Sequence, residues 1–430
     1  MMIEYLFVAL ILVLPFQFAL NAGSNADLAI TRVIIPVVFL LWLFRGLAKK
    51  KIWISNKAET WLILIFLFFV ILSVFFGEDS GKSYRKLMYF FTTVPFFFVA
   101  ADLLLSGRFR QKVAEAMVIS GTMAAVLGVV QFCLQFIVGL GAELKYTRAV
   151  APFFLGQSLG KLVENNPSWL VNVSGNTLMR AFGLFPDPHS FSVFVSLCFF
   201  VAVGYVASKE KRRFRGFAIF GLTVMLLAVL LSFSRGAYLG ILGGIIFFLA
   251  AMLGKKNMLG KILIVLVFVI LAMIISGQSS FLQRFSSSFN MREGSNAERI
   301  KNWKQAVEII VSRPLTGVGI GNYASQIDPL AGERSSIYAH DIFLDIAAET
   351  GIINGIVFAL LILIPVFRFL KEKDVLGFGL GASLIYFLVH GIFDTPIWSP
   401  QVMVLLLVIL AFGFPLTKHK NQILDAKISG

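Results

Sequence analysis

Apolar runs close to twenty residues long recur along the whole chain, and they constrain the fold more than any other feature. A helix needs about 20 mostly apolar residues to cross the hydrocarbon core of a bilayer. The runs do not show the alternating ten-residue pattern of a membrane β-barrel. The sequence therefore predicts an all-α, polytopic membrane protein. The twelve predicted spans are residues 4–21, 28–46, 59–77, 86–106, 113–140, 188–207, 216–233, 236–253, 260–277, 341–367, 375–393 and 399–416.

Composition supports a membrane protein, because 58% of the 430 residues are hydrophobic and only 14% are charged. Soluble domains average roughly 25% charged residues. The first run follows Glu4 and has no basic segment before it, so we expect a retained span and not a cleaved signal peptide. Cys133 and Cys198 both lie in apolar runs, which is not the pattern of a disulfide framework or a metal site.

The basic residues predict the orientation of the chain. The connectors after spans 2, 4, 6, 8 and 10, together with the C-terminal tail, hold 22 of the 38 Lys and Arg residues. The opposite connectors 22–27 and 394–398 hold none. By the positive-inside rule both termini are then cytoplasmic. The net charge of +15 is thus explained by membrane orientation, and we expect no nucleic-acid partner.

This orientation places two long connectors, 141–187 and 278–340, on the outer side of the membrane. Loops of this length in a compact bundle are usually functional. The second contains a predicted amphipathic helix, 297–312, which a capping box at Ser295–Glu298 begins and Pro314 ends. The predicted organisation is helices 1–5 in 1–140, the first outward loop in 141–187, helices 6–9 in 188–277, the second outward loop in 278–340, helices 10–12 in 341–416, and a cytoplasmic tail in 417–430.

A histidine and three acids stand where the second outward loop enters the tenth span. Asp341, Asp345 and Glu349 are four residues apart, so on a helix they share one face, with His340 just before it. Ionisable groups that enter a membrane span usually serve a function. A neutral imidazole can accept a proton from a hydroxyl near neutral pH, although an interfacial histidine with satisfied hydrogen bonds is the alternative.

Several arginines lie on the same predicted side, where the positive-inside rule discourages them. Arg235 stands at the turn between spans 7 and 8, Arg180 precedes span 6, and Arg299 lies in the first turn of the amphipathic helix, with Arg292 and Arg334 on either side of that helix. Each one alone has a simple alternative as a surface or snorkelling charge. Together their guanidinium groups suit the oxygens of phosphate, and a lipid-linked pyrophosphate is the anion expected at this face.

Two glycine-containing segments imitate nucleotide motifs without meeting their requirements. The segment Gly77–Ser83 has one residue too few for a P-loop, and Gly317, Gly319 and Gly321 lack the surrounding strand–helix–strand pattern of a dinucleotide site. No outward pair of acids is spaced for a divalent ion. We therefore expect a metal-independent protein without a cofactor.

Five stretches of the sequence together resemble the O-antigen ligase/O-antigen polymerase superfamily of bacterial envelope glycosyltransferases. Their order, spacing and predicted side of the membrane carry the resemblance, whereas the first five spans resemble the family only in hydropathy. The stretches are Arg180-Ala-Phe-Gly-Leu-Phe-Pro-Asp-Pro-His, Ser234-Arg-Gly-Ala, Glu298-Arg-Ile-Lys-Asn-Trp with Pro314-Leu-Thr-Gly-Val-Gly-Ile-Gly-Asn-Tyr, Tyr338-Ala-His-Asp with Glu349-Thr-Gly, and His390-Gly-Ile-Phe-Asp.

The resemblance implies a GT-C-like helical bundle in the bacterial cytoplasmic (inner) membrane. It implies an undecaprenyl-pyrophosphate-linked glycan donor and an acceptor hydroxyl at the outer face, on lipid A-core, another glycan or a protein. By motif, Arg180, Arg235 and Arg299 would contact the donor pyrophosphate and His340 would be the base. A non-enzymatic lipid-glycan transporter or flippase-like protein is the alternative.

We add Asp341 and Glu349 as candidate substrate-binding residues, because they stand in the same motif as His340. Asp341 also departs from the family pattern, which usually has Asn, Ser or Gln at that position. An acid beside the base would raise its pKa and would alter the choice of acceptor.

Overall fold

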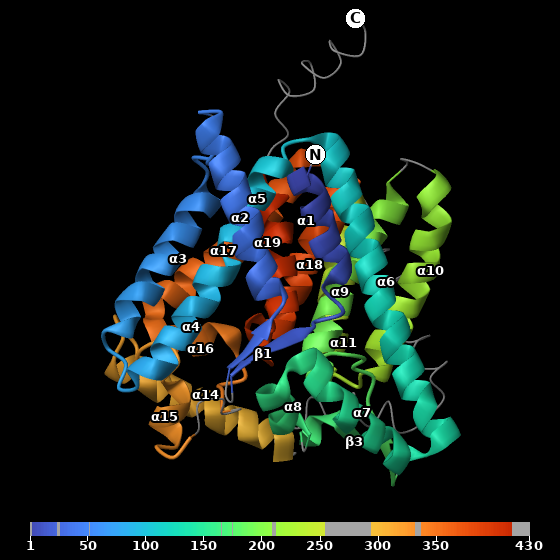
Figure 1. Cartoon of the computed structure of the whole chain (residues 1–430), viewed down its shortest axis with the longest axis vertical. Helices are drawn as coiled ribbons and strands as arrows, with labels where there is room; N and C mark the ends of the chain where they lie inside the picture. Colours follow the sequence, from blue (N-terminus) through green and yellow to red (C-terminus); the bar gives the residue numbers. More distant parts are fainter. Residues whose placement is uncertain are drawn as a thin grey trace, which may run out of the picture.

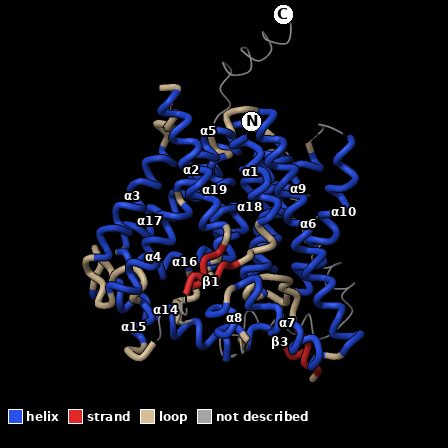
Figure 2. The backbone as a smooth tube through the Cα atoms, in the orientation of Figure 1, coloured by secondary structure: helices blue, strands red, loops and turns tan. Residues whose placement is uncertain are grey.

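The computed structural model describes residues 2–23, 26–50, 52–164, 166–173, 175–208, 212–253, 294–331 and 337–414. In this part of the chain the helices form a bundle, and most of them run between the end that carries the N-terminus and the opposite end (Figure 1). Two short antiparallel hairpins, β1–β2 and β3–β4, are the strands it contains (Figure 2). The predicted all-α, polytopic class is therefore confirmed.

Eleven of the twelve predicted spans overlap apolar helices of the bundle. Among the described residues, seven helical stretches are long and apolar enough to cross a membrane, and four more are shorter apolar helices. The twelfth span, 260–277, lies outside the described residues. The helices are α1 (Met2–Val13), α2 (Thr31–Ala48), α3 (Ala58–Val74), α4 (Ser80–Thr93), α5 (Pro95–Leu103), α6 (Gly107–Val138), α9 (Pro188–Ala207), α10 (Arg212–Leu231), α11 (Arg235–Leu253), α17 (Ile352–Glu372), α18 (Val375–Gly391) and α19 (Pro400–Ala411).

The fourth and tenth predicted spans each consist of two helices. Pro95, which has no backbone N–H, begins α5 directly after α4. Gly351, with φ at 92°, separates α16 (Ile342–Thr350) from α17. A Cβ on Gly351 would lie 2.2 Å from the Leu315 carbonyl oxygen, so only glycine fits this close approach. Asp345 and Glu349 therefore lie on a short helix that precedes the membrane-spanning helix α17, and Asp341 stands at the start of that short helix.

The connectors predicted to face outward contain secondary structure of their own. The stretch 141–187 holds α7 (Leu140–Leu155), α8 (Gln157–Val163), a 3₁₀ turn at Pro167–Trp169, β3 (Leu170–Val173) and β4 (Asn176–Met179). The connector 22–27 is part of the hairpin β1 (Ala19–Gly23) and β2 (Ala26–Ala29). The predicted amphipathic helix is α14 (Gly294–Ser312), followed by α15 (Tyr323–Ile327).

The α7, α8, β3, α14 and α15 segments gather at the end of the bundle away from the N-terminus (Figure 1). The side chains of residues 295–297 lie outside the described residues, so the capping box of α14 stays a prediction.

A buried ion pair and several arginine–carbonyl hydrogen bonds stabilise the other end of the bundle. The Arg368 guanidinium lies 2.7 Å from a carboxylate oxygen of Glu59, which is completely buried, and also donates to the carbonyl of Gly413 at 3.0 Å. Arg110 donates to the carbonyls of Leu104 and Phe412, at 2.8 Å each. These contacts satisfy carbonyl groups at the ends of α5 and α19.

We expect Glu59→Ala to destabilise the protein by about 3 kcal/mol, because it leaves the Arg368 charge without its buried partner. Glu78→Ala is the matched control, because Glu78 pairs with Arg313 at 3.7 Å and both side chains are largely exposed. Thermal unfolding in detergent compares the two variants. Equal shifts in the midpoint would contradict the importance of the buried pair.

Candidate active site

His340 stands on the loop before α16 in a strained backbone conformation. Its φ of 54° lies in the left-handed region, which non-glycine residues rarely adopt. Such outliers persist only where surrounding contacts fix them, and they are frequent at functional sites. The imidazole is 39% exposed, so it is accessible to a substrate.

The Asp345 carboxylate provides one of the contacts that fix this loop. One of its oxygens accepts the backbone N–H of Ala339 at 2.7 Å, and the other accepts the hydroxyl of Thr395. Asp345 itself is 2% exposed. It therefore joins the residue before His340 to the residue after Asp394, although the two segments lie more than fifty positions apart in the sequence.

Asp394 is the centre of the polar cluster that results. One of its carboxylate oxygens lies 3.7 Å from Nδ1 of His340, and the other lies 3.7 Å from Nδ1 of His189. Nδ1 of His189 is also 3.2 Å from the hydroxyl of Ser234, the residue before Arg235. The cluster thus joins the start of α9, the start of α11, and the loops that precede α16 and follow α18.

The electrostatics of the cluster follow from this packing. Burial alone would raise the pKa of the Asp394 carboxyl, but His340, His189 and His390 hold that pKa well below its ordinary range. Burial alone would lower the pKa of His340, but Asp394, with Asp345 behind it, raises this pKa above its ordinary value. Asp394 is therefore an anion that favours the protonated form of His340.

Two of the arginines that the sequence singles out, Arg299 and Arg235, also lie in this region. Arg299 is within electrostatic range of both the Asp394 carboxylate and Arg235. Burial lowers the pKa of Arg299, Asp394 raises it, and the charge of Arg235 lowers it again. Arg299 projects from α14, and Arg235 is the first residue of α11. Two guanidinium groups share this region with the Asp394 carboxylate, and this arrangement favours an added anion.

Arg180 is buried against backbone carbonyls close to the same cluster. Its Nε donates to the carbonyl of Ser232 at 2.6 Å, and Nη1 donates to that of Ser168 at 3.0 Å. Its charge also acts on the imidazole of His189. Arg180 thus fixes the turn between α10 and α11, which carries Arg235.

Asp341 and Glu349 have clear structural partners. The Asp341 carboxylate caps α16, accepting the backbone N–H groups of Phe343 at 2.9 Å and Leu344 at 3.0 Å. The Glu349 carboxylate accepts two hydrogen bonds from the Lys86 ammonium, at 2.7 and 2.9 Å. These partners give both acids a role in holding α16.

The glycine-rich loop before α15 explains how α16 is held from its other side. Gly317, Gly319 and Gly321 all have positive φ. A Cβ on Gly319 would lie 2.3 Å from Cα of Gly77, so the loop passes directly against the turn between α3 and α4. The N–H of Val318 donates to the carbonyl of Ala348 on α16 at 2.9 Å. The glycines therefore serve close packing.

The sequence alone does not assign a role in the site to Asp394, His189 or Lys86. Asp394 was visible as the one charged residue of connector 394–398, and His189 ends the Arg180 motif. Neither signal reveals that the Asp394 carboxylate lies close to the imidazoles of both His340 and His189. In the described part of the chain, no three His, Cys, Asp or Glu side chains are arranged to hold a metal ion.

The fold and this cluster define a polytopic membrane protein with a histidine–carboxylate centre beside arginines. Residues 220–360, which include Arg235, Arg299 and His340, match the family model described as O-Antigen ligase. This match supports the resemblance of the chain to the O-antigen ligase/O-antigen polymerase superfamily, over about a third of its length.

A curated relative is an uncharacterized protein of Haemophilus influenzae. It is 23% identical over 206 residues, which cover 43% of this chain and 49% of the relative. The chain therefore matches about half the length of that relative.

We expect Asp394→Asn to lower the pKa of His340, because it removes the negative charge that favours the imidazolium. The chain has four histidines, so NMR of the imidazole signals as a function of pH is a practical measurement. Asp341→Asn is the control. Contrary to the expectation from the sequence, Asp341 is not among the groups that raise the pKa of His340, because its carboxylate accepts the N–H groups of Phe343 and Leu344. Asparagine also caps helices, so this variant should keep the His340 pKa. An unchanged His340 pKa in Asp394→Asn would show that Asp394 does not set it.

Proposed function

We propose that the protein is a membrane glycosyltransferase of the O-antigen ligase or polymerase type. It transfers glycan from an undecaprenyl-pyrophosphate-linked donor to an acceptor hydroxyl at the outer face of the cytoplasmic membrane, with both termini in the cytoplasm. The observation that carries the proposal is the placement of His340 against Asp394, beside Arg235 and Arg299. His340 and the two arginines lie within the segment 220–360 that matches the ligase family.

His340 acts as the general base in this proposal. Asp394 faces Nδ1, so it favours the tautomer with the proton on Nδ1 and leaves the lone pair of Nε2 for the acceptor. The distance of 3.7 Å exceeds a hydrogen bond, and such catalytic contacts often shorten when substrate binds.

The reaction exchanges one C–O bond at the anomeric carbon for another and transfers one proton to His340. Nε2 of His340 takes the proton of the acceptor hydroxyl as the hydroxyl oxygen attacks the anomeric carbon of the donor sugar. The bond from that carbon to the pyrophosphate oxygen breaks, and the polyprenyl pyrophosphate leaves with the electron pair. The imidazolium then releases its proton to water.

The arginines stabilise the leaving group. Charge grows on the pyrophosphate as the glycosidic bond breaks, and fixed guanidinium groups bind the developing charge without reorganisation. Arg235 and Arg299 hold the pyrophosphate in this scheme. Arg180 supports Arg235 through the α10–α11 turn, and Asp341 and Glu349 position α16.

We expect His340→Asn to reduce kcat by roughly 10²–10⁴-fold, the usual contribution of general base catalysis. Asparagine tolerates the left-handed backbone of this position, so the fold should be kept. Donor binding should be unchanged. The assay measures glycan transfer from a fluorescent polyprenyl-pyrophosphate glycan, and near-normal transfer by His340→Asn would contradict the assignment of the base. A transporter would keep its activity in this variant.

We expect Arg299→Lys to lower kcat/KM by about tenfold to a hundredfold, because lysine keeps the charge but loses the two-pronged contact with phosphate oxygens. Arg313→Lys, just after α14 and largely exposed, is the matched control and should keep its activity. Equal activity of the two variants would mean that Arg299 does not grip the pyrophosphate.

A further inference from the structure

Helix α14 has two different apolar faces. Ala306 and Ile310 are buried against Ala347 and Ala348 of α16, and this face also carries Arg299. Successive side chains on a helix are rotated by about 100°, so Ile300 is turned away from Arg299. Ile300, Trp303, Val307 and Val311 form a second face beside the buried one, which we call the open stripe.

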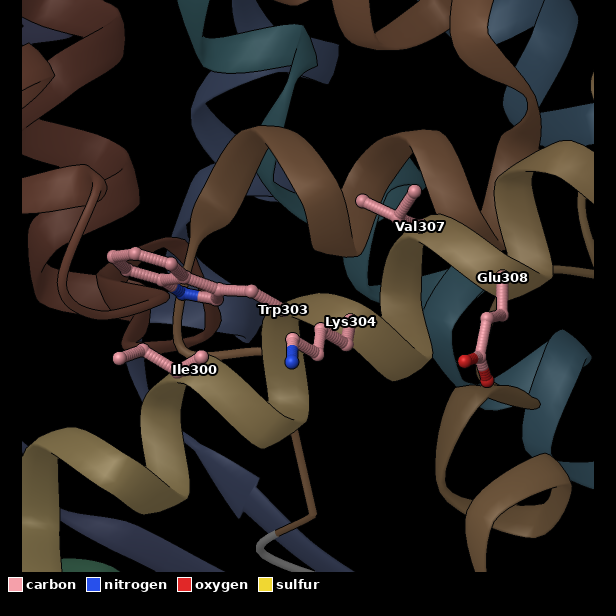
Figure 3. A pocket seen from close by; sticks show the side chains of 5 residues that line it. All are labelled: Ile300, Trp303, Lys304, Val307 and Glu308. Atoms are coloured by element: carbon pink, nitrogen blue, oxygen red, sulfur yellow. The ribbon is translucent and has the colours of Figure 1, made fainter.

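The open stripe is partly exposed, and a hollow lies over it. Val307 is 47% exposed and Val311 is 74% exposed. A shallow hollow of about 350 Å³ lies over the stripe, lined by Ile300, Trp303, Lys304, Val307 and Glu308 (Figure 3).

We propose that the open stripe binds the first isoprene units of the polyprenyl chain whose pyrophosphate lies at Arg299. This inference rests on the proposed function, because it requires a polyprenyl pyrophosphate at the arginines. The lipid is bonded directly to the pyrophosphate, so its chain must leave the site along an apolar surface. The open stripe begins at Ile300, the residue next to Arg299.

The charges along the stripe set the direction of the lipid. Lys304 lies one turn beyond Ile300, in the middle of the residues that line the hollow. Glu308 lies one turn further, where its carboxylate disfavours a phosphate. The Glu308 carboxylate therefore disfavours a phosphate towards Val311, so the pyrophosphate is expected at the Ile300 end of the stripe and the chain extends towards Val311.

The test compares binding of two pyrophosphates that carry no glycan, undecaprenyl pyrophosphate and dimethylallyl pyrophosphate, to the full-length protein in detergent micelles. The single isoprene unit of dimethylallyl pyrophosphate is too short to reach Val307, which lies about 10 Å along the helix from Ile300. The wild type should prefer the long chain. Val307→Asp should reduce this preference about tenfold, because it places a charge where later isoprene units contact the helix, and affinity for dimethylallyl pyrophosphate should stay unchanged. Val307 is half exposed, so the variant should fold.

Two control measurements define the outcome. Leu330→Asp changes a loop residue that is 93% exposed and should keep the wild-type preference. Phosphatidylglycerol, added as a competitor, should displace undecaprenyl pyrophosphate poorly.

An unchanged chain-length preference in Val307→Asp would overturn the inference, as would an equal loss of affinity for both pyrophosphates. Effective displacement by phosphatidylglycerol would show a general lipid contact and would also overturn it. If Val307→Asp abolishes the preference for the long chain but the wild type transfers no glycan to any acceptor, the open stripe still binds the polyprenyl chain, and the proposed function fails.

Discussion

The carboxylate of Asp345 holds the centre of this protein together. It accepts the N–H of Ala339 with one oxygen and the hydroxyl of Thr395 with the other, and it is almost completely buried. A buried carboxylate is costly unless both oxygens are paired, so this contact strongly selects one arrangement of the two segments. That arrangement brings His340 to Asp394.

The other acids of α16 extend the same constraint. Asp341 caps the start of the helix, and Glu349 pairs with Lys86 of α4 near its end. The Lys86 ammonium also lies 4.0 Å above the ring of Trp398, within the segment that follows Asp394. The three acids at this short helix thus fix the loops on either side of it. The strained backbone of His340 lies in the loop that Asp345 and Asp341 hold.

Much of the fold could be predicted from the sequence, because hydropathy reports the main physical requirement of a bilayer. The apolar helices of the described residues, the amphipathic helix, and the shared helical face of Asp345 and Glu349 follow from residue spacing alone. Asp341, which was predicted on the same face, is instead the extended residue that caps α16. The break at Gly351 was missed because a glycine inside an apolar run looks like part of a span. It depends on the approach of Leu315, a contact that local sequence does not show.

The candidate site could be predicted only in part for the same reason. His340 and the arginines stand out as charges among apolar residues. Asp394 and His189 acquire their meaning from contacts between α9, α11 and the loops around α16 and α18, which are far apart in the chain. Asp341 and Glu349 also acquire their roles from the fold, because residue spacing does not reveal that Asp341 caps α16 or that Glu349 pairs with Lys86.

The most direct test of the central claim is product analysis with the purified protein in lipid vesicles, supplied with an undecaprenyl-pyrophosphate glycan, with and without a hydroxyl-bearing acceptor. The proposed transfer predicts release of free undecaprenyl pyrophosphate in step with a new glycoside, and only when acceptor is present. Movement of the intact donor across the bilayer, with no cleavage in the presence of any acceptor, would contradict it.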